Sequence, residues 1–182
     1  MEDGLDELAP EIVSKRLGLS STVAAQITRY RSVADREGTV PRDEAVSVLR
    51  LVGRRPDASL VFADGGRRVA RHAARRVSGN AIAKVAPGTV GRRLANRAAR
   101  AAARETLGAE LKFPGGTAEA RVVEPLSILA WPGGEACEFY AAALSELLRL
   151  LTGFEGTMRH ESCRGRGDGA CVWRAVSAGA YE

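Results

Sequence analysis

The sequence predicts an α+β domain in which several helices pack on an antiparallel four-stranded sheet. Three observations lead to this prediction. Helical apolar spacing dominates residues 41–107, and an alternating pattern typical of strands follows it. One strongly apolar helical stretch then separates two strand–turn–strand units. The predicted order is therefore helices, hairpin, helix, hairpin.

Three helices are expected in the first part of the domain. Pro41 and Asp43 favour the start of the first helix, and Gly53 favours its end. The third helix covers residues 87–107 and ends at Gly108.

The second helix, expected over residues 57–77 with Asp57 as its N-cap, contains two adjacent glycines. Gly65 and Gly66 each cost a helix up to about 1 kcal/mol relative to alanine. They therefore mark either a kink or a place where another group approaches the backbone closely. Four apolar side chains of this helix are expected to face inward: Leu60, Val61, Val69 and Val77.

The second part of the domain changes period. Residues 109–125 read as a strand, a Gly-rich turn and a strand, because Leu111 and Phe113 alternate with charged residues. Residues 135–153 form the clearest helical pattern in the chain, and Gly153 ends it. The final stretch is predicted as a strand over 154–162, a tight loop, and a strand over 171–178.

Length and composition limit the class of protein. The 182 residues suit a single domain over residues 39–182, preceded by an acidic arm and helix over residues 1–38 that is a possible dimer contact. No apolar run is long enough to span a bilayer, and the acidic start is unlike a signal peptide. These features predict a cytoplasmic protein without a membrane span.

The net charge of +5 comes from arginines spread along two predicted helices. Arg67, Arg71 and Arg75 follow one helical stripe, and residues 93–104 carry another. Such stripes are typical of solvated helix faces, and no recognition motif accompanies them. The sequence therefore disfavours nucleic acid as a partner.

The three cysteines and one histidine form the main candidate site. Cys137 lies in the first turn of the clearest helix, while Cys163 and Cys171 lie at the adjoining ends of the last two strands. Together with His160 they suit a tetrahedral zinc site, because thiolate and imidazole are the ligands zinc prefers. A reversible Cys163–Cys171 disulfide and plain buried thiols are the alternatives. Glu161 would replace His160 as ligand if the strand were regular, since alternate residues share a face.

These residues resemble the 4-vinyl-reductase-type domain, also called the predicted hydrocarbon-binding domain. The likeness is carried by a Cys at the start of a helix and by the later stretch "HESCRGRGDGAC". From Cys137 through His160 and Cys163 to Cys171, successive donors are 23, 3 and 8 residues apart. It covers residues 135–178 most specifically. The family implies zinc at Cys137, His160, Cys163 and Cys171, with His160 standing where the family usually has Glu. It includes the sensor domain of aromatic-responsive transcription activators, and its fold resembles TRAPP-complex subunits and haem nitric-oxide sensors.

The resemblance implies a ligand cavity between helices and sheet. The functions it suggests are a zinc-stabilised sensor or carrier for an apolar, aromatic or tetrapyrrole-like molecule, a tetrapyrrole-pathway enzyme or accessory, or a protein-interaction subunit. The sequence favours the first, because no acid–base pair or nucleotide fingerprint supports catalysis. A homodimer is expected. The residues expected to line the ligand pocket are Phe62, Gly65, Gly66, Trp131, Tyr140 and Leu144.

Overall fold

A computed structural model describes residues 41–78 and 88–178, with residues 25, 28–30, 32, 33 and 36 of the N-terminal part. Contacts divide the chain into two units, Met1–Ala45 and Val46–Glu182. Most of the predicted arm over residues 1–38 lies outside the described residues, so its role as a dimer contact stays a prediction.

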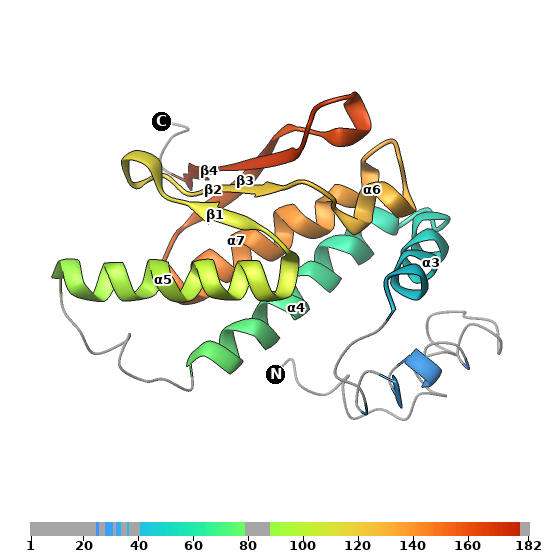
Figure 1. Cartoon of the computed structure of the whole chain (residues 1–182), viewed down its shortest axis with the longest axis horizontal. Helices are drawn as coiled ribbons and strands as arrows, with labels where there is room; N and C mark the ends of the chain where they lie inside the picture. The colour runs from blue at the N-terminus through green and yellow to red at the C-terminus, as the bar shows by residue number, and fades with distance from the viewer. Residues whose placement is uncertain are drawn as a thin grey trace. The chain divides into compact units, whose positions relative to one another are not determined.

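The predicted α+β class and element order are confirmed. Figure 1 shows helices on one side of a four-stranded sheet. Three single turns of 3₁₀ helix, η3 (Pro114–Gly116), η4 (Glu135–Cys137) and η5 (Arg164–Arg166), lie between the main elements. In chain order the main elements are α3 (Arg42–Gly53), α4 (Ala58–Ser78), α5 (Gly88–Leu107), β1 (Glu110–Lys112), β2 (Glu119–Val122), α6 (Leu126–Ala130), α7 (Glu138–Thr152), β3 (Gly156–Ser162) and β4 (Cys171–Ser177).

The sheet is antiparallel, with strand order β1-β2-β4-β3. Trp173 in β4 is central, because it pairs with Ala120 of β2 on one side and with His160 of β3 on the other. These three residues lie on the face that packs on the helices. The opposite face carries ion pairs, in which Arg174 contacts Glu119 and Glu161. One packed face and one charged face are usual for an antiparallel sheet.

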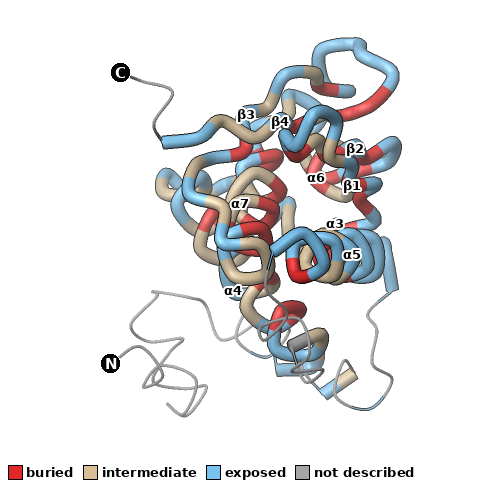
Figure 2. The backbone as a smooth tube through the Cα atoms, turned by 90° about the vertical axis from the view of Figure 1, so that its left-hand side faces the viewer, coloured by how far each residue is buried: buried red, intermediate tan, exposed pale blue. Residues whose placement is uncertain are grey.

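Helix α7 is the central element of the core. It contacts α4, α5 and β3, and its side chains Leu144, Leu147 and Leu148 are almost wholly buried. In Figure 2, buried positions gather where α7 faces the sheet and the neighbouring helices. The apolar spacing that predicted this helix is therefore the spacing of its core contacts.

Glycines end two helices as the sequence predicted. Gly108 after α5 and Gly153 after α7 both have positive φ, at 61° and 71°. The Gly153 N–H donates to the carbonyl of Arg149, which closes the last turn of α7.

One inward position was predicted wrongly. Leu60 is 73% exposed, whereas Phe62 and Ala63 beside it are buried. Helices α4 and α7 run in the same direction, since Gly66 faces Phe139 and Arg71 meets Glu146 further along. The buried positions of α4 follow one helix face, which Phe62, Ala63 and Gly66 share. Leu60 lies about 120° around the helix from Gly66 and therefore faces away from α7.

Candidate metal centre

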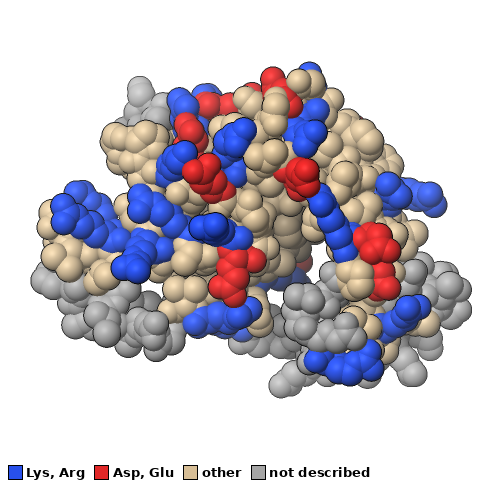
Figure 3. Space-filling model, in the orientation of Figure 1, with Lys and Arg blue, Asp and Glu red and all other residues tan. Residues whose placement is uncertain are grey.

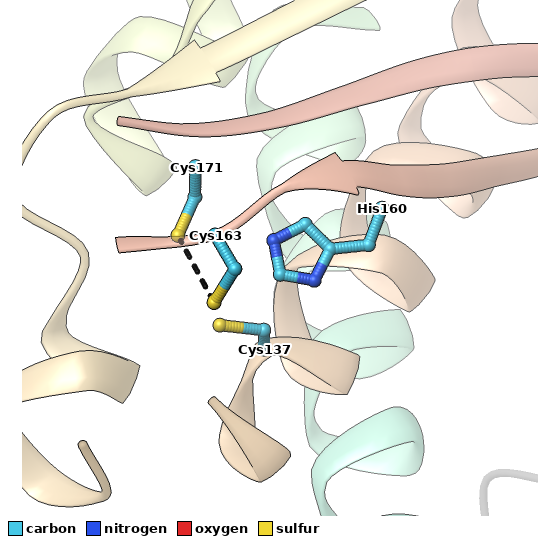
Figure 4. Close-up of side chains that lie close together, drawn as sticks. All are labelled: Cys137, His160, Cys163 and Cys171. Carbon is cyan, nitrogen blue, oxygen red and sulfur yellow. Dashed lines mark hydrogen bonds between the residues drawn. The ribbon is translucent and has the colours of Figure 1, made fainter. Parts of the chain in front are cut away.

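Four side chains converge where α7 begins and the β3–β4 hairpin closes. Cys137 ends η4 and precedes α7, His160 lies in β3, Cys163 follows β3, and Cys171 opens β4. One potential ligand atom from each lies within 4.8 Å of all the others. Figure 4 shows the three sulfurs together, with the histidine ring beside them. The structure thus brings together all four residues that the sequence singled out.

A bulge in β3 selects His160 over Glu161. His160 pairs with Trp173 and Ser162 pairs with Val172, so Glu161 is the extra residue between two consecutive pairs. A bulge interrupts the alternation of faces. His160 and Cys163 can therefore serve one site, and Glu161 instead contacts Arg159 and Arg174 on the outer face.

The loop between β3 and β4 holds Cys163 and Cys171 in position. Asp168 accepts a hydrogen bond from the Cys163 N–H at 2.7 Å, and its own N–H donates to the Cys163 carbonyl. The Arg164 N–H donates to the Cys171 sulfur at 3.4 Å. Such N–H donors stabilise negative charge on sulfur, which a metal-bound thiolate carries.

The segment before α7 seals the other side of the cluster. The hydroxyl oxygen of Ser127 in α6 lies 3.3 Å from the Cys137 sulfur. Gly134 has a φ of 90°, and a Cβ there would lie 2.8 Å from the Cys163 sulfur. Only glycine fits this conformation and this contact without strain. The three sulfurs are buried, with Cys137, Cys163 and Cys171 exposed by 2% or less.

Burial opposes charge on the thiols. Desolvation raises the pKa of Cys137 to about 12, despite the hydrogen bond to Ser127, and burial also raises the pKa of Cys171. Burial lowers the pKa of His160, and the nearby Arg166 lowers it further. Both effects on His160 favour the neutral imidazole, the form that binds metals, while a cation close by would favour loss of the protons from Cys137 and Cys171.

The unpaired His160 nitrogen and the softness of the donors also favour a metal ion at this site. The Nε2 atom of His160 is buried and has no hydrogen-bond partner. An unpaired buried polar atom costs about 1–3 kcal/mol, and coordination would remove that cost. Three sulfurs and one nitrogen are soft donors, which suit zinc better than magnesium or calcium. The group can hold a metal ion with four protein ligands.

The structure does not contain the alternative disulfide between Cys163 and Cys171. All three cysteines are free, and the Cys163 and Cys171 sulfurs lie 3.9 Å apart, within the weak contact range of two thiols. Cys137 and His160 reach the same point. A simple pair of cysteines does not account for that convergence.

An aromatic stack supports the histidine from within the core. The His160 ring lies 4.6 Å from the Trp173 ring, nearly parallel to it. Trp173 in turn stacks on Tyr140 at 5.4 Å, and the Tyr140 hydroxyl accepts a hydrogen bond from the Leu126 N–H. This stack limits where the imidazole can turn.

The residues expected to line a ligand pocket are dispersed or packed. Phe62, Tyr140 and Leu144 are buried at 4% exposure or less. A Cβ at Gly66 would overlap the Phe139 carbonyl oxygen and lie 3.0 Å from the Ala143 nitrogen. The space expected beside Gly66 is therefore filled by the backbone of α7. Gly66 marks a close approach of two helices, which was the second interpretation of the glycine pair.

The other two residues expected to line that pocket, Gly65 and Trp131, contact different neighbours. Gly65 is loosely packed, with Phe139 ring atoms 3.9 Å from where its Cβ would be. The Trp131 ring packs on Gly53 of α3, where a Cβ would come within 2.8 Å of it. His72, the other histidine of the chain, is exposed.

Two supporting residues of the centre were not predicted from the sequence. Asp168 lies in "GDG", a turn signal that could have indicated a side chain bonding nearby backbone. Ser127 carries no such signal, because its contact with Cys137 depends on how α6 packs.

Comparisons with known proteins add nothing to this geometry, since no protein-family model matches the chain and no curated protein does either. Within the described residues, no helix has both the length and the apolar character needed to cross a membrane.

Proposed function

We propose that the Cys137, His160, Cys163 and Cys171 cluster holds one zinc ion with a structural role. The observation that carries this proposal is the convergence of four soft donors within 4.8 Å of one another. Four protein ligands leave no open position for substrate or water, and closed sites of this kind stabilise folds. When bound, zinc would supply positive charge that stabilises the buried thiolates and would link the β3–β4 hairpin to the start of α7.

We propose further that the domain is a zinc-stabilised small-molecule binding module, a sensor or carrier of the 4-vinyl-reductase type. Two observations support this. The donor spacing resembles that family, and an open groove with a mixed apolar and basic lining lies at the other end of α7. The metal centre itself is too closely packed to admit a ligand, so binding must occur elsewhere on the domain.

Elemental analysis of the full-length protein tests the metal. We expect about one zinc per chain, from the four-ligand count. His160→Ala should lower the zinc content or affinity, whereas Glu161→Ala should leave both unchanged, because Glu161 faces the opposite side of the sheet. Protein with three titratable thiols and no transition metal would contradict the proposal.

Mass spectrometry of an organic extract tests the binding module. We expect a retained small molecule with an apolar portion, in about stoichiometric amount. An extract that contains no such molecule, from protein that retains its zinc, would argue against a sensor or carrier.

A further inference from the structure

An open groove of about 1050 Å³ lies at the C-terminal end of α7. Helix α5 forms one wall, and the last turn of α7 with Phe154 forms the other. The turn between β1 and β2 and the end of β4 complete it. The groove is therefore at the opposite end of α7 from Cys137, and its volume is at the upper limit of small-molecule sites.

The groove has an apolar floor that is only partly covered. Phe113, Leu151 and Phe154 line it and are half-buried, while Leu148 and Ala118 beneath them are buried. Partly exposed aromatic and aliphatic side chains in a concave surface favour an apolar ligand, because binding removes their area from water.

One wall carries a basic stripe. Arg92, Asn96 and Arg100 are spaced four residues apart along α5, so they lie along the groove on one helix face. Arg92 and Arg100 are exposed, and the Arg100 guanidinium lies 5.3 Å from the centre of the Phe113 ring. Figure 3 shows basic side chains gathered over α5 on this face.

No carboxylate balances this charge. The residues that line the groove include no Asp or Glu. Glu105 is paired with Arg76 and Glu110 with Lys112, while the exposed Glu155, which follows Phe154, is not among the lining residues. Neither Arg92 nor Arg100 has an ion pair within the described residues. The groove therefore presents two guanidinium groups beside an apolar floor.

We propose that this groove binds an amphipathic carboxylic acid. The carboxylate would contact Arg92 or Arg100, since a guanidinium presents two parallel donors that match a carboxylate. The aliphatic or aromatic body would cover Phe113, Leu151 and Phe154. This inference rests on the proposed binding function and names its site and ligand class. A neutral apolar molecule would cover the floor but would form no charge-assisted hydrogen bond with the guanidinium groups.

Calorimetric titration of the full-length protein with decanoate, and with decan-1-ol as the neutral match, tests the proposal. The test variant is Arg92→Gln with Arg100→Gln. The control variant is Arg93→Gln with Arg97→Gln, which removes the same charge from the same helix at exposed positions outside the groove. We expect wild type to bind decanoate about tenfold or more tightly than decan-1-ol, because a charge-assisted pair is lost with the alcohol.

The test variant should weaken decanoate binding by about tenfold or more, and the control pair by less than about twofold. Equal losses in both variants, or equal affinity for acid and alcohol in wild type, would overturn the proposal. Suppose that decanoate does not bind, yet the organic extract holds another small molecule whose amount the test variant leaves unchanged. The ligand class is then wrong while the binding module stands. An empty extract and no binding of either probe overturn both.

Discussion

The two ends of α7 are built in opposite ways. At its start, four donor atoms lie within 4.8 Å of one another, and even a methyl group at Gly134 would collide with the Cys163 sulfur. At its end, half-buried apolar side chains lie beside exposed arginines that have no ion-pair partner within the described chain. The first arrangement suits an ion that stays in place. The second suits a ligand that enters and leaves.

Between these ends, α7 is joined to α4 by one close contact and one ionic cluster. Gly66 lies against the backbone at Phe139, and Glu146 contacts both Arg71 and Arg149. These contacts fix the helix that carries both sites. The comparison therefore predicts large stability effects at the start of α7, intermediate effects along its length, and small ones at the groove.

The largest effect is expected at the metal centre. Cys163→Ser should lower the free energy of unfolding by about 3 kcal/mol or more, because metal binding contributes directly to folding in such sites. The melting temperature should fall by roughly 10 °C. Excess chelator added to wild type should cause a similar fall, measured by thermal unfolding monitored by circular dichroism.

Glu161→Ala is the neighbouring control for that measurement. Its side chain contacts Arg159 and Arg174 on the outer face, so its loss should cost at most about 1 kcal/mol. If Cys163→Ser melted at the wild-type temperature, a structural metal between β3, β4 and α7 would be untenable.

The next effect is expected at the contact between α4 and α7. Gly66→Ala should lower stability by about 2 kcal/mol, since its new methyl would overlap the Phe139 carbonyl and force the helices apart. Gly65→Ala should raise stability by up to about 1 kcal/mol, because its methyl makes only ordinary contacts and alanine favours a helix. Urea unfolding measures both. Changes of the same sign in the two variants would contradict this account of the contact.

The adjacent glycines also show where sequence reasoning stops. A glycine within a helical pattern indicates a close approach but does not name the group that approaches. The partner of Gly66 is the backbone of α7, more than seventy residues later. Local periodicity carries no information about that pairing, so the predicted pocket was placed where two helices meet.

The metal centre was more accessible to prediction than the groove. Cys163 and Cys171 are brought together by one hairpin. The chain has only three cysteines and two histidines, so few residues could serve as soft metal ligands. The choice of His160 over Glu161 still depended on a bulge, which no residue of the strand announces. The groove is assembled from several separate elements, and its arginines follow the same spacing as a solvated face. Only the packed structure distinguishes arginines that line a groove from arginines on a solvated helix face.

A smaller effect is expected at Glu146, whose side chain is 8% exposed. Hydrogen bonds from Arg149 and Arg71 lower its pKa from 4.5 to about 2. Glu146→Gln should cost about 1–2 kcal/mol at pH 7, discounted because both arginines are partly exposed. A lowered carboxyl pKa stabilises the fold above about pH 4.5, and this contribution is lost as the pH falls towards 2.

Urea unfolding at pH 7 and pH 3 checks this dependence. The difference between wild type and Glu146→Gln should narrow at the lower pH. Glu105→Gln is the control, because the Arg76–Glu105 pair is largely exposed and should contribute less than about 1 kcal/mol. A difference that stayed constant between the two pH values would show that the glutamate acts through its shape and not through its charge.

The smallest effect is expected at the groove. Arg92→Gln with Arg100→Gln should change the free energy of unfolding by at most about 1 kcal/mol. Neither residue has an ion pair within the described chain, and only the exposed contact of Arg100 with Phe113 is lost. The zinc content should stay unchanged, because the metal centre lies at the other end of α7. Thermal unfolding and elemental analysis of the same preparation measure both quantities. A fall in stability comparable to that of Cys163→Ser would mean that these arginines support the fold, and the contrast between a closed end and an open end of α7 would fail.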